Sequence, residues 1–371
     1  MNRRNFLQTT FGIGVATASG TILTACQAIT ADYGPLLAAD ANGLMLPTGF
    51  TSRIVATTGV AVAGTSHVWH GAPDGGAVFP TGGGGWIYTS NSELSSSAGG
   101  VGAIEFNSAG TIIAARTILS GTTRNCAGGT TSWGTWLSCE ETSTGQVWEC
   151  DPTGATSAVA RPAMGRFNHE AAAEDPATGI FYLTEDSSTG GFYRFVPTTP
   201  GDLSAGTLQV MTEVSLTLGW ATIADPDGSP TATRSQVATM KQFNGGEGCW
   251  YRAGVVVFTT KGDNRVWGYN IAANTLTIMY DDNTSPTPIL TGVDNVTISP
   301  KTPHVFVAED GGNMEVVAVD LTGQTAYPFV RITGRSGSEV TGPAFTPDGS
   351  RMYFSSQRTP GETFEVTGPF K

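Results

Sequence analysis

The sequence predicts an all-β protein, a six-bladed β-propeller, and three observations lead to this fold class. Glycine is abundant, with 49 copies among 371 residues, and only 13% of the residues are charged. Short apolar segments alternate with runs rich in Thr, Ser and Gly, which is typical of a protein made of many short strands. Six of the apolar segments end in a polar or acidic cluster, and they recur along the chain.

Residues 1–30 are interpreted as a twin-arginine export signal and a lipoprotein-type tether. The segment NRRNFLQ resembles the twin-arginine motif, and a mildly apolar run follows it. The sequence LTAC then places Cys26 in a lipobox, where the thiol would be acylated. A plain secretory signal with a coincidental cysteine is the alternative. We expect export by the twin-arginine route to the periplasm or cell surface, with a lipid anchor as the only link to the membrane.

Residues 40–371 are expected to form one six-bladed propeller domain. Its repeated strands start at roughly 45- to 50-residue intervals, a period typical of propeller blades, with one longer gap of about 75 residues. The extra residues fall around 197–241, an insertion rich in Pro, Thr and Ser. The six strands are Trp86–Asn91, Thr135–Glu140, Ile180–Asp186, Val255–Asp263, His304–Asp310 and Met352–Gln357.

The last four of these strands are each preceded by a second apolar segment that opens with an acid. Turn sequences such as DPATG and TPDGS separate the two segments, so each pair is predicted to be a β-hairpin. In an antiparallel pair, the start of the first strand and the end of the second lie at the same edge. Inner hairpins of a propeller would therefore gather these side chains at one end of the central channel.

We expect six residues to form a metal cluster there: Glu93, Cys139, Glu170, Glu247, Asp294 and Glu339. Carboxylates this close repel one another unless they are protonated or bind cations. Oxygen ligands in this number suit Ca²⁺, whereas the thiol of Cys139, in the stretch WGTWLSCEE, favours a softer ion such as iron or zinc. A mixed cluster satisfies both. The alternatives are a disulfide or core role for Cys139 and solvated loop carboxylates for the acids.

A second set of residues is assigned as supports or further ligands of the cluster: Glu140, His169, Asn295, Glu309 and Asp310. Glu140 is expected to face away, because side chains alternate along a strand. His169 is expected to orient the neighbouring carboxylate by a hydrogen bond. Asp74 is interpreted as a turn residue.

Four cysteines remain after the signal, namely Cys126, Cys139, Cys150 and Cys249. An oxidising compartment permits two disulfides, but at most one if Cys139 is a ligand. The net charge of −12 argues against a nucleic-acid partner. The serine-hydrolase elbow, the HExxH motif, the P-loop and the dinucleotide fingerprint are all absent from the sequence.

The residues quoted above resemble the PhoX-type alkaline phosphatase family, as a compact member, over roughly residues 45–365. The resemblance rests on WGTWLSCEE, NHEA, TGIFYLTED, GFYRFVP, AEDG and GPAFTPDG taken together. It implies a six-bladed propeller in which Ca²⁺ and Fe³⁺, bridged by an oxo group, hydrolyse phosphate monoesters. The expected partners are small phosphorylated substrates, and the expected state is a monomer.

The sequence departs from the family pattern in its phosphate-binding arginines. Family members commonly carry one near the acid of the fourth hairpin, but here Glu247 follows Asn-Gly-Gly. Arg124, Arg166 and Arg265 are candidates that no motif places. Two alternatives therefore stay open: a non-catalytic, calcium-stabilised propeller that binds a ligand or partner, and a related calcium-dependent ester hydrolase.

Overall fold

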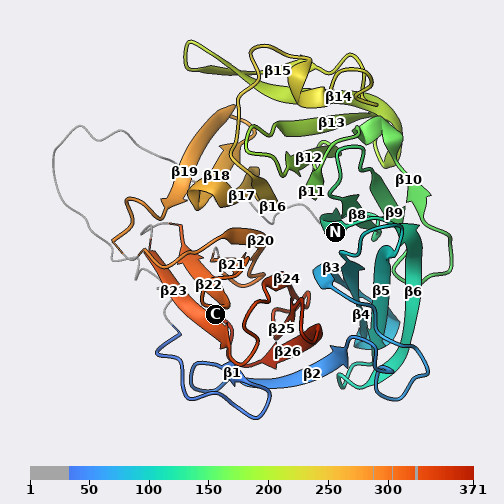
Figure 1. The fold of residues 1–371 in the computed structure, drawn as a ribbon, viewed down its shortest axis with the longest axis vertical. Helices are drawn as coiled ribbons and strands as arrows, with labels where there is room; N and C mark the ends of the chain where they lie inside the picture. The colour runs from blue at the N-terminus through green and yellow to red at the C-terminus, as the bar shows by residue number, and fades with distance from the viewer. Residues whose placement is uncertain (1–32, 287, 303, 322–324) are drawn as a thin grey trace, which may run out of the picture. The chain divides into compact units, whose positions relative to one another are not determined.

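The computed structural model describes residues 33–286, 288–302, 304–321 and 325–371. The predicted signal, with Cys26, lies outside the described residues. Residues Ala31–Lys371 form one unit. Within this unit, six antiparallel sheets are arranged around a central axis (Figure 1), so the predicted six-bladed propeller is confirmed.

The first three blades follow one another along the chain. Blade 1 contains β3 (Pro73–Pro80), β4 (Trp86–Ser92), β5 (Gly99–Phe106) and β6 (Ile112–Thr122). Blade 2 contains β7 (Asn125–Thr130), β8 (Trp136–Glu140), β9 (Val147–Cys150) and β10 (Val159–Ala160). Blade 3 contains β11 (His169–Asp175), β12 (Ile180–Glu185), β13 (Phe192–Thr199), β14 (Asp202–Val214) and β15 (Thr217–Thr222).

The other three blades complete the ring, and two of them include a strand from the N-terminal region. Blade 4 contains β16 (Gly246–Arg252), β17 (Val255–Thr260), β18 (Arg265–Asn270) and β19 (Thr275–Asp281). Blade 5 contains β20 (Val293–Ile298), β21 (Val305–Glu309), β22 (Glu315–Asp320), β23 (Thr325–Ile332) and β1 (Leu44–Met45). Blade 6 contains β24 (Val340–Phe345), β25 (Arg351–Ser356), β26 (Glu362–Thr367) and β2 (Thr51–Thr57).

The two ends of the described chain meet in blade 6. Strand β2 pairs with β26, with Thr51 opposite Thr367, so an early strand forms the outer edge of the last blade. Strand β1 covers the edge of β23 in blade 5 in the same way. These two pairings tie the last two blades to the beginning of the described chain and close the ring, which leaves only short outer edges on the blades.

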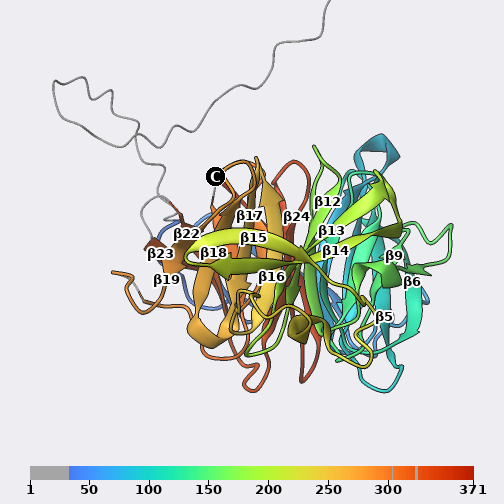
Figure 2. The same cartoon turned by 90° about the horizontal axis from the view of Figure 1, so that it is seen from above.

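The predicted insertion at 197–241 is structured and belongs to blade 3. It contains the end of β13, all of β14 and β15 and the short 3₁₀ helix η3 (Thr233–Ser235). Strand β15 is the fifth strand of the blade and lies at its outer edge (Figure 1). In Figure 2 the inner strands run from one face of the propeller to the other, whereas β14 and β15 cross the outside.

Glycine on the innermost strands lets neighbouring blades approach closely. A Cβ atom on Gly129 of β7 would lie 1.7 Å from the carbonyl oxygen of Ala172 in β11, so only glycine fits there. Aromatic rings fill the wider space between the blades, as where Phe192 of blade 3 stacks on Phe258 of blade 4 with ring centres 4.3 Å apart. Among the described residues, no helix has the length and apolar character needed to cross a membrane.

Candidate metal centre

A β-bulge recurs at the same place in the inner hairpin of five blades. In blade 1, Pro73 pairs with Ser92 but Gly76 pairs with Ser90, so two residues of β3 face one residue of β4. The same irregularity follows the first pair of β7, β11, β16 and β20. A bulge bends the strand and re-aims its side chains. The first bulged residues are Asp74, Cys126, Glu170, Glu247 and Asp294.

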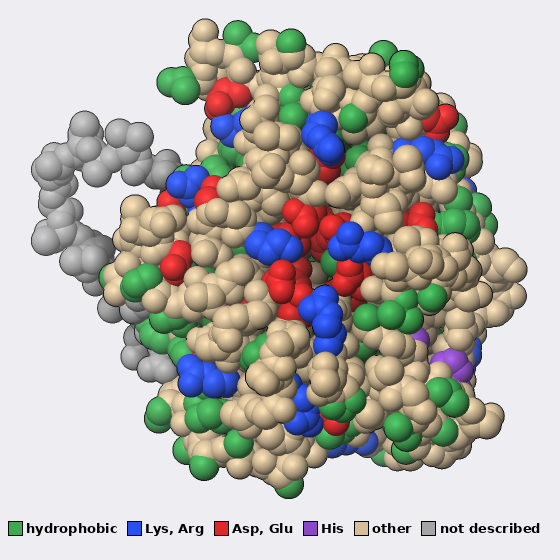
Figure 3. Space-filling view, viewed as in Figure 1, with side chains coloured by type: hydrophobic (Ala, Val, Ile, Leu, Met, Phe, Trp, Pro, Cys, Tyr) green, Lys and Arg blue, Asp and Glu red, His purple; other side chains and the backbone are tan. Residues whose placement is uncertain are grey.

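A second set of side chains comes from the residue that follows the other strand of each hairpin. In blades 1 to 5 these residues are Glu93, Glu141, Asp186, Lys261 and Asp310. Blade 6 contributes Glu339, which precedes β24, and Arg358, which lies beyond β25. With Arg124, the two sets line one cavity of about 110 Å³. Figure 3 shows acidic side chains gathered in the middle of this face, with basic side chains around them.

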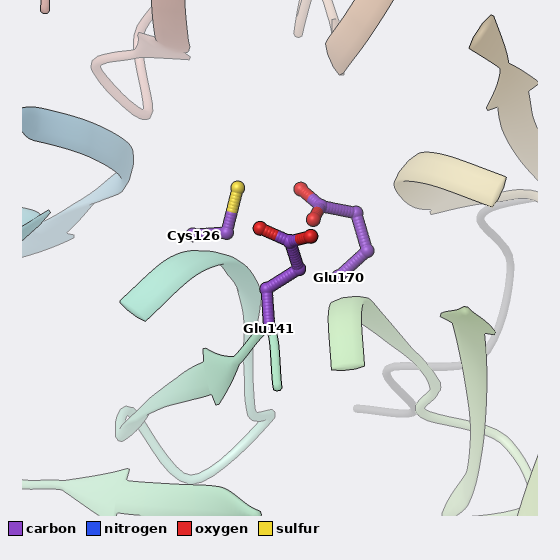
Figure 4. A group of neighbouring side chains, drawn as sticks. All are labelled: Cys126, Glu141 and Glu170. Carbon is purple, nitrogen blue, oxygen red and sulfur yellow. The ribbon is translucent and has the colours of Figure 1, made fainter. Parts of the chain in front are cut away.

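Three groups of pocket residues have the composition and spacing to hold cations, because the ligand atoms in each group lie within 4.8 Å of one another. The first group consists of Cys126, Glu141 and Glu170, whose side chains point toward one another in Figure 4. The second group consists of Asp74, Glu93 and Glu339, and the third of Glu170, Glu247 and Asp294. Only the first group offers sulfur, so its donors suit a softer ion, whereas the other two offer carboxylate oxygens alone.

The metal-free pocket holds its carboxyl groups in a poor environment for negative charge. Burial, and then the neighbouring carboxylates, raise the pKa of Asp74 and of Glu170 well above their ordinary values. Burial also raises the pKa of Glu141 and of Asp294 to about 7 and that of Glu339 to about 9. One buried oxygen, Oε1 of Glu170, has no hydrogen-bond partner among the described residues. Bound cations would supply the missing partner and reverse these shifts.

The thiol of Cys126 shares this environment. Burial and the nearby Asp74 carboxyl group raise its pKa, so the metal-free protein carries a neutral thiol. Its Sγ donates to Oδ2 of Asp74 at 3.7 Å. A metal ion deprotonates a coordinating thiol, so this side chain becomes a strong ligand only when a cation is present.

Three basic residues compensate the acids at the rim of the pocket, and two of them are arginines. Arg124 pairs with Glu93 at 2.9 Å and also with Glu141. Arg358 lies 2.6 Å from Glu339 and 3.8 Å from Glu93. The side chains of Arg124 and Arg358 are 41% and 49% exposed, whereas Glu93 is 11% exposed, so the guanidinium groups face the solvent side of the acids.

Lys261 is the third basic residue and occupies the equivalent place in blade 4. Its Nζ lies 2.9 Å from Oε1 of Glu247, close enough for an ion pair although not aligned as a hydrogen bond. The same ammonium group lies 3.6 Å from Asp186 and 3.4 Å from Asp310. Burial by itself would lower the pKa of Lys261, but the surrounding carboxylates, Glu247 foremost, outweigh it and raise this pKa. The lysine therefore stays charged in the metal-free pocket.

Most of the acids predicted from the sequence line this pocket. The structure brings together Glu93, Glu170, Glu247, Asp294, Glu339 and, from the supporting set, Asp310. Their assignment as metal ligands remains a prediction.

Cys139 does not line the pocket, and its place among the cluster residues is corrected by the structure. It is fully buried in an apolar cluster with Leu137 and Val147. Side chains alternate along β8, so Ser138 faces blade 1 and bonds to Asn91, whereas Leu137 and Cys139 face the apolar side chains of blade 3. The thiol at the pocket belongs to Cys126, on the neighbouring strand β7.

Four supporting residues also lie away from the cavity. Glu140 accepts hydrogen bonds from the backbone N–H groups of Thr123 and Gln146, so it faces away as expected. Glu309 accepts from the N–H groups of Thr291 and Glu315.

The other two are His169 and Asn295, and His169 does not orient the carboxylate of Glu170. Its Nε2 lies 2.9 Å from the carbonyl oxygen of Gly165, and its ring stacks on Phe167. Asn295 supports the pocket from behind: its Nδ2 donates to Oδ1 of Asp294 at 3.0 Å, and its Oδ1 accepts from the N–H of Gly342.

The sequence reasoning missed Asp74, Cys126 and Glu141 as pocket residues. Asp186, which ends the third of the predicted strands, lines the pocket as well. Asp74 sits in PDGG and Cys126 in NCAGG, and both runs look like turns. The signal that could have found them is positional, because each stands one residue into the first strand of its hairpin, as Glu170 and Glu247 do. The four described cysteines are all free, so neither disulfide alternative holds among them.

The fold and the pocket together define a class of protein: a six-bladed propeller whose channel ends in buried carboxylates and one thiol. The family model of alkaline phosphatase PhoX matches residues 85–148 and 143–265. The match of this family model, together with the shared fold, supports placing the chain with the PhoX-type alkaline phosphatases, a metal-dependent family of hydrolases.

Solved structures share the propeller fold. PhoX from Pseudomonas fluorescens, in complex with vanadate, a transition state analogue, aligns with a TM-score of 0.73 at 15% identity, over 90% of this chain and 97% of that one. A Bacteroides thetaiotaomicron protein of unknown function gives 0.56 at 7% identity, over 85% and 76%. A putative gluconolactonase gives 0.51 at 12% identity, over 90% and 98%. No curated protein sequence matches the chain.

Proposed function

We propose that this protein hydrolyses phosphate monoesters in the pocket at the end of the channel, with bound metal ions. The observation that supports this most strongly is the combination of three candidate cation-binding groups, two of which share Glu170, with two partly exposed arginines at the rim of the pocket. A phosphoryl group carries several negative oxygens, and metal ions together with guanidinium groups are the usual means of binding it.

The donor atoms suggest how the metals divide. The group of Cys126, Glu141 and Glu170 suits Fe³⁺, because it alone contains a thiol. The group of Asp74, Glu93 and Glu339 suits Ca²⁺, which prefers carboxylate oxygens. When bound, the cations supply Lewis-acid stabilisation of the phosphoryl oxygens.

The chain's own contribution is to bind and orient the phosphate. Arg124 contacts Oε1 of Glu93, and Arg358 lies 3.8 Å from Oε2 of the same carboxylate, so both guanidinium groups are available to an anion bound beside Glu93. The arginine missing before Glu247 is thus replaced by arginines from blades 2 and 6 and by Lys261 at the end of the same hairpin. Arg166 pairs with Asp227, and Arg265 pairs with Asp263 and Asp281, so neither supplies this function.

The test is turnover of p-nitrophenyl phosphate by the metal-loaded protein, before and after chelation. Glu170→Gln should abolish turnover and lower the metal content. Glu174→Gln is the matched control, because Glu174 is buried on the same strand but bonds to Ser132 outside the pocket. A fully loaded sample that turns over no phosphate ester would contradict the proposal.

Export and lipid anchoring at Cys26 remain proposals supported by the sequence motifs of residues 1–30, and a monomeric state remains a proposal as well. Replacing Arg3 and Arg4 together by Lys should retain the protein in the cytoplasm, and Cys26→Ala should release it from the membrane fraction. Cell fractionation measures both, and unchanged distributions would contradict them.

A further inference from the structure

Each blade has one position, directly after the second strand of its inner hairpin, that lies at the pocket end of the channel. In blade 6 this position is occupied by Gln357. In blades 1 to 5, the first residue pair of the inner hairpin is followed, on the second strand, by a residue that lines the pocket. In blade 1 this pair is Pro73 with Ser92, and the pocket residue is Glu93. In blade 6 the first pair is Val340 with Ser356, so Gln357 is the equivalent residue. Its counterparts in the other blades are Glu93, Glu141, Asp186, Lys261 and Asp310. The ring position that is charged in five blades is therefore a neutral amide in the sixth.

This one residue contacts every member of the oxygen-only group formed by Asp74, Glu93 and Glu339. Nε2 of Gln357 donates to Oδ2 of Asp74 at 2.7 Å and to Oε2 of Glu93 at 2.9 Å. Its backbone N–H donates to the carbonyl oxygen of Glu339 at 3.1 Å. The residue is only 1% exposed. Its Oε1 has no hydrogen-bond partner among the described residues, so the side-chain hydrogen bonds of this amide go to the two carboxylates.

The amide performs a task that a carboxylate at this position could not. Two carboxylates that share a buried site repel each other, and the NH₂ group between them holds one oxygen of each, while the N–H of Gly75 and the guanidinium of Arg124 hold the other two. A carboxylate in place of the amide would add a third negative group within hydrogen-bond distance of both. Residues that hold ligands in this way commonly change metal affinity by about 10- to 100-fold.

We propose that Gln357 is a positioning residue that sets the cation affinity of the group formed by Asp74, Glu93 and Glu339, by donating from its amide to two of its carboxylates. This inference rests on the proposed function only in that this group binds a cation. It does not depend on the reaction that the protein catalyses.

The experiment measures cation binding without turnover. Tb³⁺ luminescence reports the oxygen-only groups, and Co²⁺ titration reports the thiolate absorption of Cys126. Gln357→Met should weaken the tightest Tb³⁺ binding by about 10- to 100-fold and leave the Co²⁺–thiolate band unchanged. Gln357→Glu, which cannot donate, should weaken Tb³⁺ binding as well.

Thr341→Val is the matched control. Thr341 is buried at the same end of blade 6 and bonds to the carbonyl oxygen of Pro73, but to none of the three carboxylates. This variant should bind Tb³⁺ as the parent protein does. Equal affinity of Gln357→Met and the parent protein would overturn the proposal. So would tighter binding by Gln357→Glu, because it would make Oε1 a direct ligand. Loss of phosphatase activity with unchanged Tb³⁺ affinities would affect the proposed function alone.

Discussion

Arg124 of blade 2 reaches across to Glu93 of blade 1, with its Nε 2.9 Å from Oε1 of the carboxylate. The backbone of Arg124 is held on both sides, because its N–H donates to Leu94 and its carbonyl accepts from the N–H of Glu141. Its φ of 50° lies in the left-handed region, which is unusual for a residue other than glycine. Such a conformation, fixed between two pocket acids, indicates that the direction of this guanidinium group matters.

Arg124→Lys should therefore weaken substrate binding. A lysine cannot make the two-pronged contact with a phosphate, so the KM for p-nitrophenyl phosphate should rise by about tenfold or more, with a smaller effect on kcat. Steady-state kinetics on the metal-loaded variant measure this. Arg166→Lys is the control, because Arg166 pairs with the exposed Asp227 outside the pocket and should leave KM unchanged. An unchanged KM in Arg124→Lys would show that this arginine does not bind substrate.

Serine substitutions of Cys126 and Cys139 should have opposite effects on the bound iron and on the stability of the protein. Cys126→Ser should remove the soft donor of the pocket and lower the bound iron, with little loss of stability. Cys139→Ser should keep the iron but place a hydroxyl group among Leu137 and Val147, which costs about 1–3 kcal/mol in the free energy of unfolding. Elemental analysis and thermal denaturation of the two variants separate the effects. Iron loss in Cys139→Ser alone would restore Cys139 as the metal ligand.

The metal-free protein should become less stable as the pH rises. The folded-state pKa values of Glu141 and Asp294 are raised to about 7 and that of Glu339 to about 9, so the folded state binds more protons than the unfolded state above about pH 4.5. Stability from these groups is thus complete below their ordinary pKa and is lost as the pH rises toward 9. A tenfold change in the proton affinity of one group corresponds to about 1.4 kcal/mol, or about 2–4 °C in Tm for a large domain.

Thermal denaturation of the chelated protein between about pH 5 and 9 measures this loss, since the three pKa values fall within that range. Addition of Ca²⁺ should flatten the profile, because bound cations favour the deprotonated carboxylates. A Tm of the chelated protein that rises over this range would contradict the pKa assignments.

Lys261→Met should lower the stability of the metal-free protein and increase the stabilisation that added cations provide. The change leaves Glu247, Asp186 and Asp310 without their ammonium partner. Breaking a fully buried pair costs about 3–5 kcal/mol, and about 1–2 kcal/mol is expected here because Lys261 is 35% exposed. The Tm measured with and without Ca²⁺ tests this, and Lys241→Met, which breaks a single ion pair with Glu213 outside the pocket, is the control. A larger drop in the control would refute the assignment.

The sequence was enough to predict the propeller and the end of the channel where the acids meet, because strand period and hairpin geometry determine both. It was not enough to assign individual side chains. Cys139 and Cys126 lie on paired strands of one hairpin, and only the bulge that follows Asn125 decides which thiol reaches the cavity. Arg124 was named as a candidate but could not be placed, since it precedes its hairpin and owes its position to a left-handed backbone conformation.

Closure of the ring by the two chain ends has a consequence for biosynthesis. The oxygen-only group takes Asp74 and Glu93 from the first blade and Glu339 from the last, and Gln357 links them. A ribosome must therefore translate nearly the whole chain before this cation position can exist. A truncated product could fold some blades and still lack it, so loading of this position would mark a polypeptide that has been completed from end to end.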